Sequence, residues 1–238
     1  TYLQNAEKDL IRIRENYGIR SNNQIAFVAR RLFKEQLEKT SYFQNIFFVN
    51  KNELVVRPEV KDVRSSFYSF QNDWYKKIKK EGSPLWTAAH KSMTGDSYTF
   101  TVAVPVYDYS DKFIGVIGGD INLKKLSNMI EWKINRSGYV FMTDQNGQVI
   151  AHPNFEKLKT GFNINTQIDN KGWLDRNKGN FVYSNDQTNK EYLLSYQKIG
   201  FGAIIASVPT SEAFAMIDVV RNNIIKVGLV MLVITILI

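Results

Sequence analysis

The chain contains no cysteine and only two histidines, His90 and His152. The lack of cysteine excludes disulfides, thiolate metal ligands and a cysteine nucleophile, and it suits an oxidising compartment. Neither histidine stands in a metal spacing such as HExxH or beside a GxSxG turn. We therefore predict no catalytic residue, no metal site and no cofactor, and for His152 we expect a structural role.

Charge of one sign is not concentrated anywhere along the chain. The net charge is +8, but the 31 lysines and arginines are interspersed with 23 acidic residues. No base-reading motif accompanies the charge, so a nucleic-acid partner is not expected. The 44% of hydrophobic and 13% of aromatic residues are sufficient for two modest hydrophobic cores.

Two segments of the chain repeat the same pattern. FFVNKNELVVRP (47–58) and VFMTDQNGQVIAHP (140–153) each read as a strand, a turn and a strand that ends at proline. The ribbon and helix start at 98–126 recur at 190–214. A period of roughly 90 residues fits a small α+β domain and is too long for a solenoid repeat. The sequence thus predicts two tandem α+β modules.

The N-terminal region has the periodicity of a helix. Apolar residues follow three- and four-residue steps, and one long helix, straight or kinked, is expected to about Lys39; the spaced residues are Leu3, Ala6, Leu10, Ile13 and Tyr17. This seam could pack on its own domain or on a partner helix. We expect a homodimer formed through this helix.

The only long hydrophobic run is at the other end of the chain. From Val227 the sequence reads VGLVMLVITILI. A membrane span needs about 20 apolar residues, so we interpret this run as part of a span, with a buried terminal helix as the alternative. We expect a helix from Thr210, capped by Thr210 or Ser211, to continue into it.

Between these ends, short strands alternate with polar loops. Strands are expected at 43–50, 52–57, 98–107, 112–121, 139–143, 148–152, 180–185, 190–197 and 201–208. Helices are expected over 73–81, with Asp73 as cap, and from Leu123 to about Ile134. The predicted fold class is α+β: a long N-terminal helix and two modules with antiparallel sheets.

Aromatic and acidic residues gather in the first module. Trp74 and Tyr75 are adjacent on a short helix, and Asp120 ends an apolar strand after the glycines of GVIGGD (115–120). Those glycines do not form a phosphate-binding GxGxxG, and they favour a close backbone approach instead. Asp120 either caps the next helix or contacts a cation, because a buried acid needs a partner. The other candidate ligand contacts are Tyr68, Asn72, Asp73, Trp86, His90, Tyr98 and Tyr107.

DWYKKI (73–78), VPVYDYSDKFIGVIGGDINL (104–123) and GYVFMTDQNGQVIAHP (138–153) together resemble the double Cache sensor domain of bacterial receptors. The resemblance covers nearly the whole chain. It implies a periplasmic or extracellular sensor with two PAS-like modules, of which the membrane-distal one binds a small molecule. It also implies a dimerisation helix at 1–40, a distal module at 41–135, a proximal module at 136–209 and a helix entering a membrane span at 210–238.

Members of this family that bind amino acids are similar in Trp74, Tyr75 and Asp120, but they carry an arginine where this chain has Asn72. His90 and Ser92 also replace a tyrosine and an aspartate. Without the arginine, a carboxylate clamp is lost. We therefore expect an amino acid or amine ligand, with a non-amine metabolite such as a carboxylate or purine, or a structural ectodomain without a ligand, as alternatives.

Overall fold

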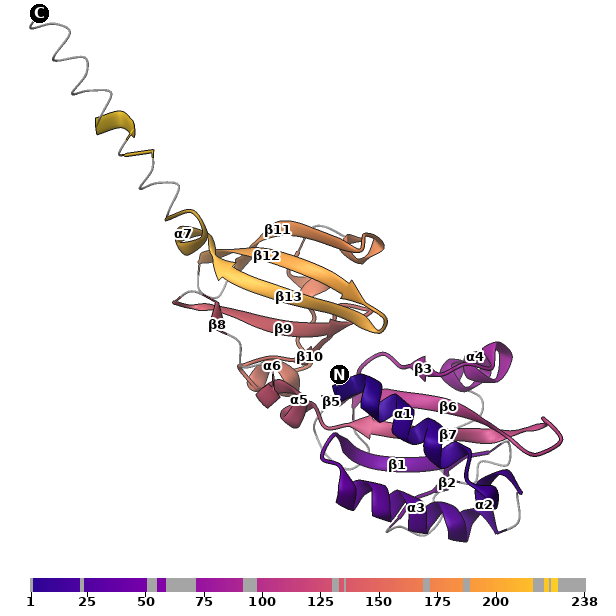
Figure 1. Ribbon diagram of the computed structural model, residues 1–238. Helices are drawn as coiled ribbons and strands as arrows, with labels where there is room; N and C mark the ends of the chain where they lie inside the picture. The colour runs from indigo at the N-terminus through magenta and orange to yellow at the C-terminus, as the bar shows by residue number, and fades with distance from the viewer. Residues whose placement is uncertain are drawn as a thin grey trace, which may run out of the picture.

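The computed structural model describes residues 2–21, 24–50, 55–58, 72–91, 98–129, 133–134, 136–168, 172–185, 189–215, 221–222 and 224–226, and the statements below concern these residues. Two antiparallel sheets follow one another along the long axis of the molecule, and helices cover the first (Figure 1). The α+β fold with N-terminal helices and two sheet modules is confirmed. We keep the names first module (41–135) and second module (136–209).

The two sheets share one topology. The first has the strand order β2-β1-β7-β6-β3 and the second has the order β10-β9-β13-β12-β11. In each sheet a hairpin lies at one edge, formed by β1 and β2 in the first sheet and by β9 and β10 in the second. The last strand of each module, β7 or β13, pairs with the first strand of that hairpin. This match confirms the tandem repeat predicted from the sequence. The strands of the first sheet are β1 (Phe43–Val49), β2 (Val55–Val56), β3 (Leu85–Trp86), β6 (Thr101–Tyr107) and β7 (Phe113–Ile121).

The second sheet carries one additional short strand at its edge. Its strands are β8 (Lys133–Ile134), β9 (Gly138–Asp144), β10 (Val149–Ala151), β11 (Lys178–Asn185), β12 (Lys190–Ile199) and β13 (Gly202–Pro209). A separate two-stranded ribbon pairs β4 (His90–Lys91) with β5 (Tyr98–Thr99). Most predicted strands are found within two residues of their expected ends; β2 is shorter, and residues 51–54 lie outside the described part.

The N-terminal region is three helices, so the prediction of one long helix is wrong. They are α1 (Tyr2–Arg14), α2 (Tyr17–Arg20) and α3 (Ile25–Lys39). The side chain of Asn16 accepts a hydrogen bond from the N–H of Gly18 at 3.0 Å and starts α2. Gln24 then adopts a left-handed backbone, with φ of 52°, directly before α3. Helical periodicity continues in the sequence across both breaks, so the spacing of apolar residues does not predict where the helices end.

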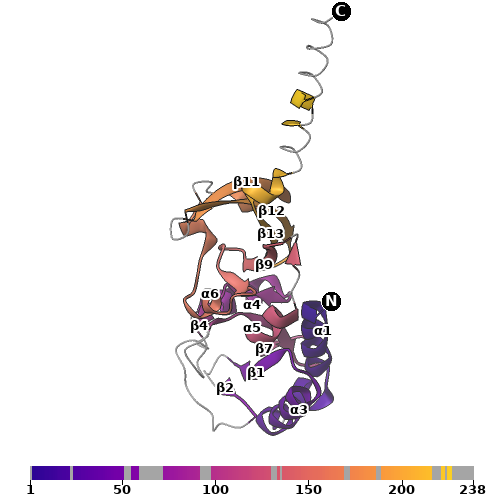
Figure 2. The ribbon, with the colours of Figure 1, turned by 90° about the vertical axis from the view of Figure 1, so that its left-hand side faces the viewer.

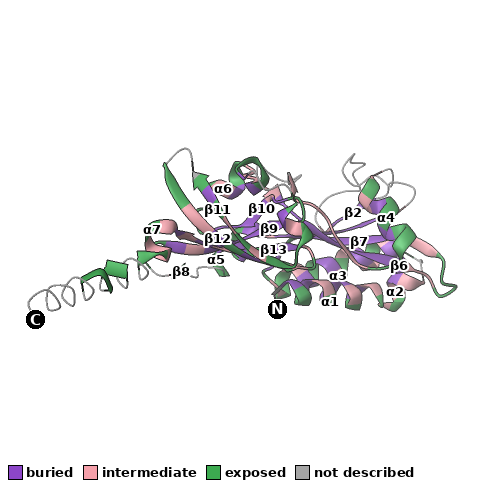
Figure 3. Ribbon diagram, turned by 90° about the horizontal axis from the view of Figure 1, so that it is seen from above, coloured by how far each residue is buried: buried purple, intermediate pink, exposed green. Residues whose placement is uncertain are grey.

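The apolar seam of α1 packs on the chain's own first sheet. Leu3, Ala6, Leu10 and Ile13 are buried in the core, whereas Tyr17 is 74% exposed. These side chains cannot form a partner-helix seam, so that interpretation is corrected. The exposed residues of α1 are all polar: Gln4, Asn5, Lys8 and Arg12. Figure 3 shows how far the residues of this helix are buried. Figure 2 shows α1 and α3 on one side of the first sheet, away from β4.

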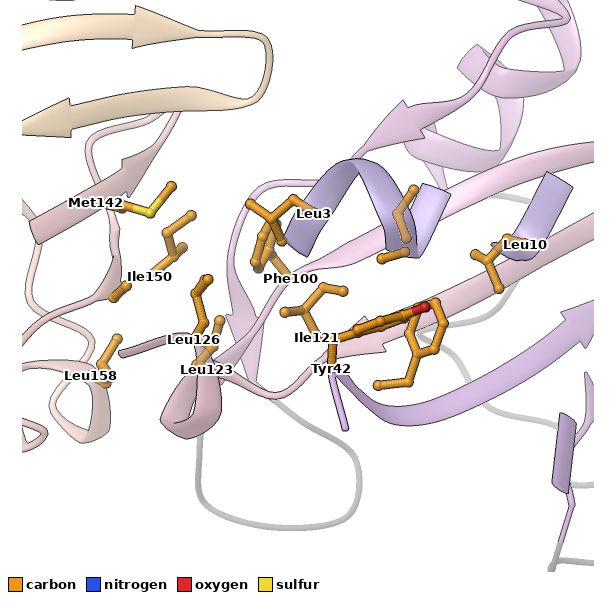
Figure 4. Packing of buried hydrophobic residues seen from close by; sticks show 14 of the residues in the cluster. Leu3, Leu10, Tyr42, Phe100, Ile121, Leu123, Leu126, Met142, Ile150 and Leu158 are labelled. Carbon is orange, nitrogen blue, oxygen red and sulfur yellow. The ribbon is translucent and has the colours of Figure 1, made fainter. Parts of the chain in front are cut away.

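A short helix, α5 (Leu123–Met129), connects the modules. It ends earlier than the predicted Ile134, because β8 begins at Lys133. Leu123 and Leu126 of α5 lie between Phe100 and Ile121 of the first module and Met142, Ile150 and Leu158 of the second (Figure 4). One hydrophobic core therefore runs through both modules.

Short helices complete the second module: α6 (Glu156–Lys159) and the 3-10 helices η2 (Ile164–Thr166) and η3 (Trp173–Asp175). Trp173 is buried edge-to-face against Tyr196 at a ring distance of 4.8 Å. Its indole N–H donates to Asn165 Oδ1 at 2.6 Å. The aromatic residue of this module is thus committed to the core.

The chain leaves the second sheet through α7 (Thr210–Ala213). Pro209 precedes this helix and no side chain caps it, so the expected cap at Thr210 or Ser211 is wrong. Glu212 in its first turn accepts the backbone N–H of Ser137 at 3.2 Å. Among the described residues, no helix is long and apolar enough to span a bilayer. The expected span at 227–238 lies outside the described residues.

Candidate functional site

The first sheet has two apolar faces, because successive side chains of a strand point to opposite sides. One face packs on α1 and α3. The other meets α4 (Asp73–Glu81), whose Tyr75 and Ile78 are buried against the sheet. We call this second surface the α4 face. Its sheet residues are Phe47, Val49, Val55, Ala103 and Val116.

Asp120 lies on the α4 face, in phase with Val116 on β7, and is only 4% exposed. The hydroxyl of Thr101 donates to Oδ1 at 2.6 Å, and the amide of Asn45 donates to Oδ2 at 3.3 Å. The helix-cap alternative is wrong, because Asn122 accepts the N–H of Lys125 in α5 instead. A buried carboxylate needs hydrogen-bond donors or a cation, and Thr101 and Asn45 supply two of the donors.

His90 stands beside Asp120. Its Nδ1 lies 3.1 Å from the carbonyl oxygen of Ala88, and its Nε2 lies 3.4 Å from Thr101 Oγ1. A carbonyl can only accept, so Nδ1 carries a proton, and the Thr101 oxygen faces Nε2 as an acceptor because its one proton goes to Asp120. Burial lowers the pKa of His90, against the opposing effects of the Ala88 hydrogen bond and the Asp120 charge. The ring thus lies next to the Asp120 carboxylate and is held by Ala88 and Thr101.

Trp74 and Tyr75 form the helical wall of this face. Their rings meet edge-to-face at 5.7 Å, and Tyr75 packs on Phe113 at the same distance. Trp74 Nε1 and the Tyr75 hydroxyl are buried and have no hydrogen-bond partner in the described structure. Burial raises the pKa of Tyr75 to about 12, so the hydroxyl keeps its proton. Unsatisfied buried donors each cost about 1–3 kcal/mol, which an acceptor on a ligand would relieve.

Three of the sequence-based candidates lie elsewhere. Trp86 faces the opposite side of the sheet, where its Nε1 donates to Glu7 Oε2 at 3.0 Å. Tyr98 packs against Gly161 of the second module. The side chain of Asp73 is fully exposed beside Lys76. Parity explains the Trp86 correction: its neighbour Leu85 on β3 is the residue that contacts the α4 face.

Two further candidates, Asn72 and Tyr107, lie at the two ends of α4. Asn72 precedes α4, half-buried, without a side-chain capping bond, so the expected Asp73 cap is also corrected. Tyr107 packs on Phe113 at 5.8 Å and lies beside Gly82, which ends α4. Tyr68 and Ser92 lie outside the described residues. No group of three acidic or imidazole side chains in the described ranges could hold a metal ion.

Asn45 and Thr101 were missed by sequence reasoning. Both act through the register of β1 and β6 with β7, which places each directly opposite Asp120. The sequence signal for them is weak, since a threonine or asparagine in a strand is ordinary. Close packing on this face also needs Gly118, where a Cβ would come within 2.1 Å of the Phe47 ring.

Known proteins resemble this chain over most of its length. The family model of the Cache domain, dCache_1, matches residues 1–217. The methyl-accepting chemotaxis protein McpA of Pseudomonas putida is 30% identical over 128 residues, which are 51% of this chain and 20% of that protein. The chain spans about a fifth of the length of such relatives.

Solved structures share the fold. The ligand-binding domain of Mlp24 with asparagine has a TM-score of 0.67 and 22% identity, covering 91% of this chain and 88% of that one. That of the Pseudomonas aeruginosa PAO1 chemoreceptor PctB in complex with L-Arg has a TM-score of 0.68 and 16% identity, covering 90% of each chain. The chain thus belongs to the Cache domain family, and it is a sensor domain of the kind found in bacterial chemoreceptors.

Proposed function

We propose that this domain senses a small, amine-bearing ligand on the α4 face of the first module, as the extracytoplasmic part of a bacterial transmembrane receptor. The observation that carries the proposal is the buried Asp120 carboxylate, which lies on the α4 face together with Trp74 and Tyr75. An ammonium group has three N–H donors, and a carboxylate is a charged acceptor for them. The faces of Trp74 and Tyr75 supply apolar area that also attracts cations.

The missing arginine restricts the ligand class. Asn72 is neutral and cannot form the bidentate, charged contact that an arginine makes with a carboxylate. The solved PctB and Mlp24 domains are in complex with L-Arg and with asparagine, which are amino acids. The ammonium group of an amino acid is the part that a carboxylate such as Asp120 would recognise. We therefore favour an amine, with or without a carboxylate, over an acid or a purine.

The test uses matched compounds. L-leucine, isoamylamine and 4-methylpentanoate share a side chain and differ in the charged groups, and a wider set of amines, amino acids and purines would accompany them. Ligand at 100 times its dissociation constant should stabilise the domain by about 2.7 kcal/mol, a readily measured rise in melting temperature. We expect active compounds to carry an amine. Stabilisation by acids alone, or by no compound, would contradict the proposal.

The response follows from differential affinity. A ligand that draws the Trp74 helix toward Asp120 must bind one conformation better than the other, and the shift in population is the signal. The output could be a chemotaxis, kinase or cyclase domain. Assembly as a homodimer also remains part of the proposal, on a surface other than the buried seam of α1.

A further inference from the structure

A cavity remains at the junction of the two modules, although the junction is closely packed elsewhere. The Trp86 ring of the first module packs on Phe201 of the second at a ring distance of 5.2 Å, and Asp144 of the second module accepts the N–H of Ala89 at 2.7 Å. The cavity measures about 170 Å³, and residues of β1, β5, α5 and α6 line it. Its described lining includes neither Asp120 nor any residue of α4, so it is separate from the proposed amine site.

Part of the lining is apolar. Leu123 of α5 and Leu158 of α6 are almost completely buried and belong to the core shared by the modules, and the Phe155 ring adds to this apolar surface. An apolar cavity of about 150 Å³ is known to hold benzene, whereas sites for drug-sized ligands measure about 300–1,000 Å³. The junction cavity therefore suits a molecule close to benzene in size.

The charged part of the lining is basic. Lys124 of α5 and Lys159 of α6 each place Nζ 5.8 Å from the centre of the Phe155 ring. Lys159 also pairs with Glu156 at 2.7 Å, but an ammonium group has three N–H donors and can serve a second acceptor. The charged residues of these two helices are four lysines and one acid: Lys124, Lys125, Lys157, Lys159 and Glu156. This excess of positive charge favours an anion.

Two neutral side chains add hydrogen-bond donors. Oδ1 of Asn122 accepts the N–H of Lys125 at 3.0 Å, so the other end of this amide presents its two N–H donors. Neither these donors nor the Tyr98 hydroxyl has a hydrogen-bond partner within the described ranges. Both side chains line the cavity. Positive charge, neutral donors and an apolar surface together complement a carboxylate that carries a short hydrocarbon tail.

We propose that the junction cavity binds a small aliphatic monocarboxylate. Lys124 and Lys159 hold the carboxylate, with Asn122 as a further donor. The hydrocarbon tail lies on Leu123 and Leu158. The bound acid contacts α5 and α6 together, and it therefore stabilises the docked arrangement of the two modules. This site does not depend on the amine site of the first module.

Sodium butanoate is the probe for this site, because its size is close to that of benzene. Butylamine and 1-butanol keep the hydrocarbon tail and replace the carboxylate by a cationic or a neutral group. Sodium phosphate at matched ionic strength tests an anion without a tail. Two-dimensional NMR of the whole domain measures the binding, through the backbone N–H of Gly161 beside Tyr98 and the side-chain amide of Asn122.

A matched pair of double variants separates the site from general attraction to basic surface. Lys124→Gln with Lys159→Gln removes the two ammonium groups that line the cavity. Lys125→Gln with Lys157→Gln removes the same charge from the same two helices, at residues that do not line it.

We expect butanoate to shift both NMR signals to saturation, and the other three compounds to leave them unchanged. The first double variant should raise the dissociation constant about five- to tenfold, and the second by less than about twofold. Equal weakening in the two double variants would overturn the proposal. Saturation by 1-butanol or phosphate to the same degree, or the lack of a saturable shift with butanoate, would also overturn it. If the screen for amines finds no ligand, the proposed function fails and the outcome with butanoate still decides this proposal.

Discussion

A buried carboxylate such as Asp120 is expensive to maintain unless it serves a partner. Removing an ionised group from water costs several kcal/mol, and hydrogen bonds from Thr101 and Asn45 offset only part of that cost. An apolar or amide residue would pack in the same strand at lower cost. A carboxylate at this position is what the proposed amine ligand requires.

Asp120→Asn tests this directly. The amide keeps the shape but removes the charge, so affinity for an amine ligand should fall by about 1.5–3 kcal/mol, which is roughly ten- to 150-fold in the dissociation constant. Titration calorimetry measures it. Asp73→Asn is the matched control, since its fully exposed side chain should contribute nothing. Equal affinity in both variants would remove Asp120 from the site.

His152 predicts an acid-sensitive fold. Burial, with a smaller effect of the Lys157 charge, lowers its pKa to about 4, while its Nδ1 accepts the N–H of Asn154 at 2.8 Å. The unfolded chain therefore binds this proton near pH 6.5 and the folded chain only near pH 4, so stability falls as the pH drops through that window. The loss between pH 7 and 4.5 should be about 2 kcal/mol.

Urea unfolding at both pH values measures that loss. His152→Asn keeps an acceptor for Asn154 and removes the titration, so its stability should change less between the two pH values. A residual slope of the same sign is expected from His90, whose pKa burial also lowers. An unchanged slope in the variant would assign the acid sensitivity to other groups.

At the scale of elements, α1 belongs to the first sheet. Gln36 of α3 donates to Asp9 of α1 at 2.8 Å, and the apolar side of α1 covers β6 and β7. The helix thus covers the face of the first sheet opposite the α4 face. Its length and register are set by this packing, because a helix of 13 residues is marginal on its own.

Leu10→Ala should therefore destabilise the domain rather than alter assembly. Leu10 is fully buried, and the loss of its side chain should cost about 2–5 kcal/mol in the free energy of unfolding. Chemical denaturation measures this. Lys8→Ala, on the exposed face two residues away, should change it by less than about 0.5 kcal/mol. Equal effects would mean that α1 is not part of the core.

Gly118 in β7 and Gly200 between β12 and β13 differ in the space that a new methyl group would find. At Gly118 a new methyl group would overlap the Phe47 ring, whereas at Gly200 nothing lies within 4 Å. Gly118→Ala should cost about 1–3 kcal/mol by overpacking and should also weaken ligand binding, because Phe47 lines the same face. Gly200→Ala should do neither. A neutral Gly118→Ala would show that the ring moves aside freely.

Sequence patterns identified the parts of this fold that depend on local chemistry. Alternation and turns located most strands, and DWYKKI with GVIGGD located Trp74, Tyr75 and Asp120. What escaped prediction depends on contacts between distant residues. The break between α1 and α3 follows from a cap at Asn16 and a left-handed Gln24. The hydrogen bond between the modules, in which Asp144 accepts the N–H of Ala89, uses a backbone group that every residue except proline has.

At the scale of the whole molecule, the two modules form one cooperative body. The aromatic contact of Phe201 with Trp86 and Phe100 and the shared core around α5 leave little freedom between them. A single unfolding transition is the expected behaviour of such a structure.

Phe201→Ala should uncouple the modules. Calorimetry of the wild type should show one transition, and the variant should show two overlapping ones, because the remaining junction is smaller. Phe27→Ala, which truncates a 69% exposed ring on α3, is the control and should keep one transition. Two transitions in the wild type would contradict the shared core.

The contact of Phe201 with the first module also defines which piece of this protein can be exchanged. A hybrid receptor made by joining the first module to a foreign second module would expose the rings of Trp86 and Phe100 and leave the N–H of Ala89 without its carboxylate. Such hybrids should aggregate or lose ligand response. Transferring both modules together, from α1 to α7, keeps every one of these contacts and makes the paired unit the natural cassette for biosensor construction.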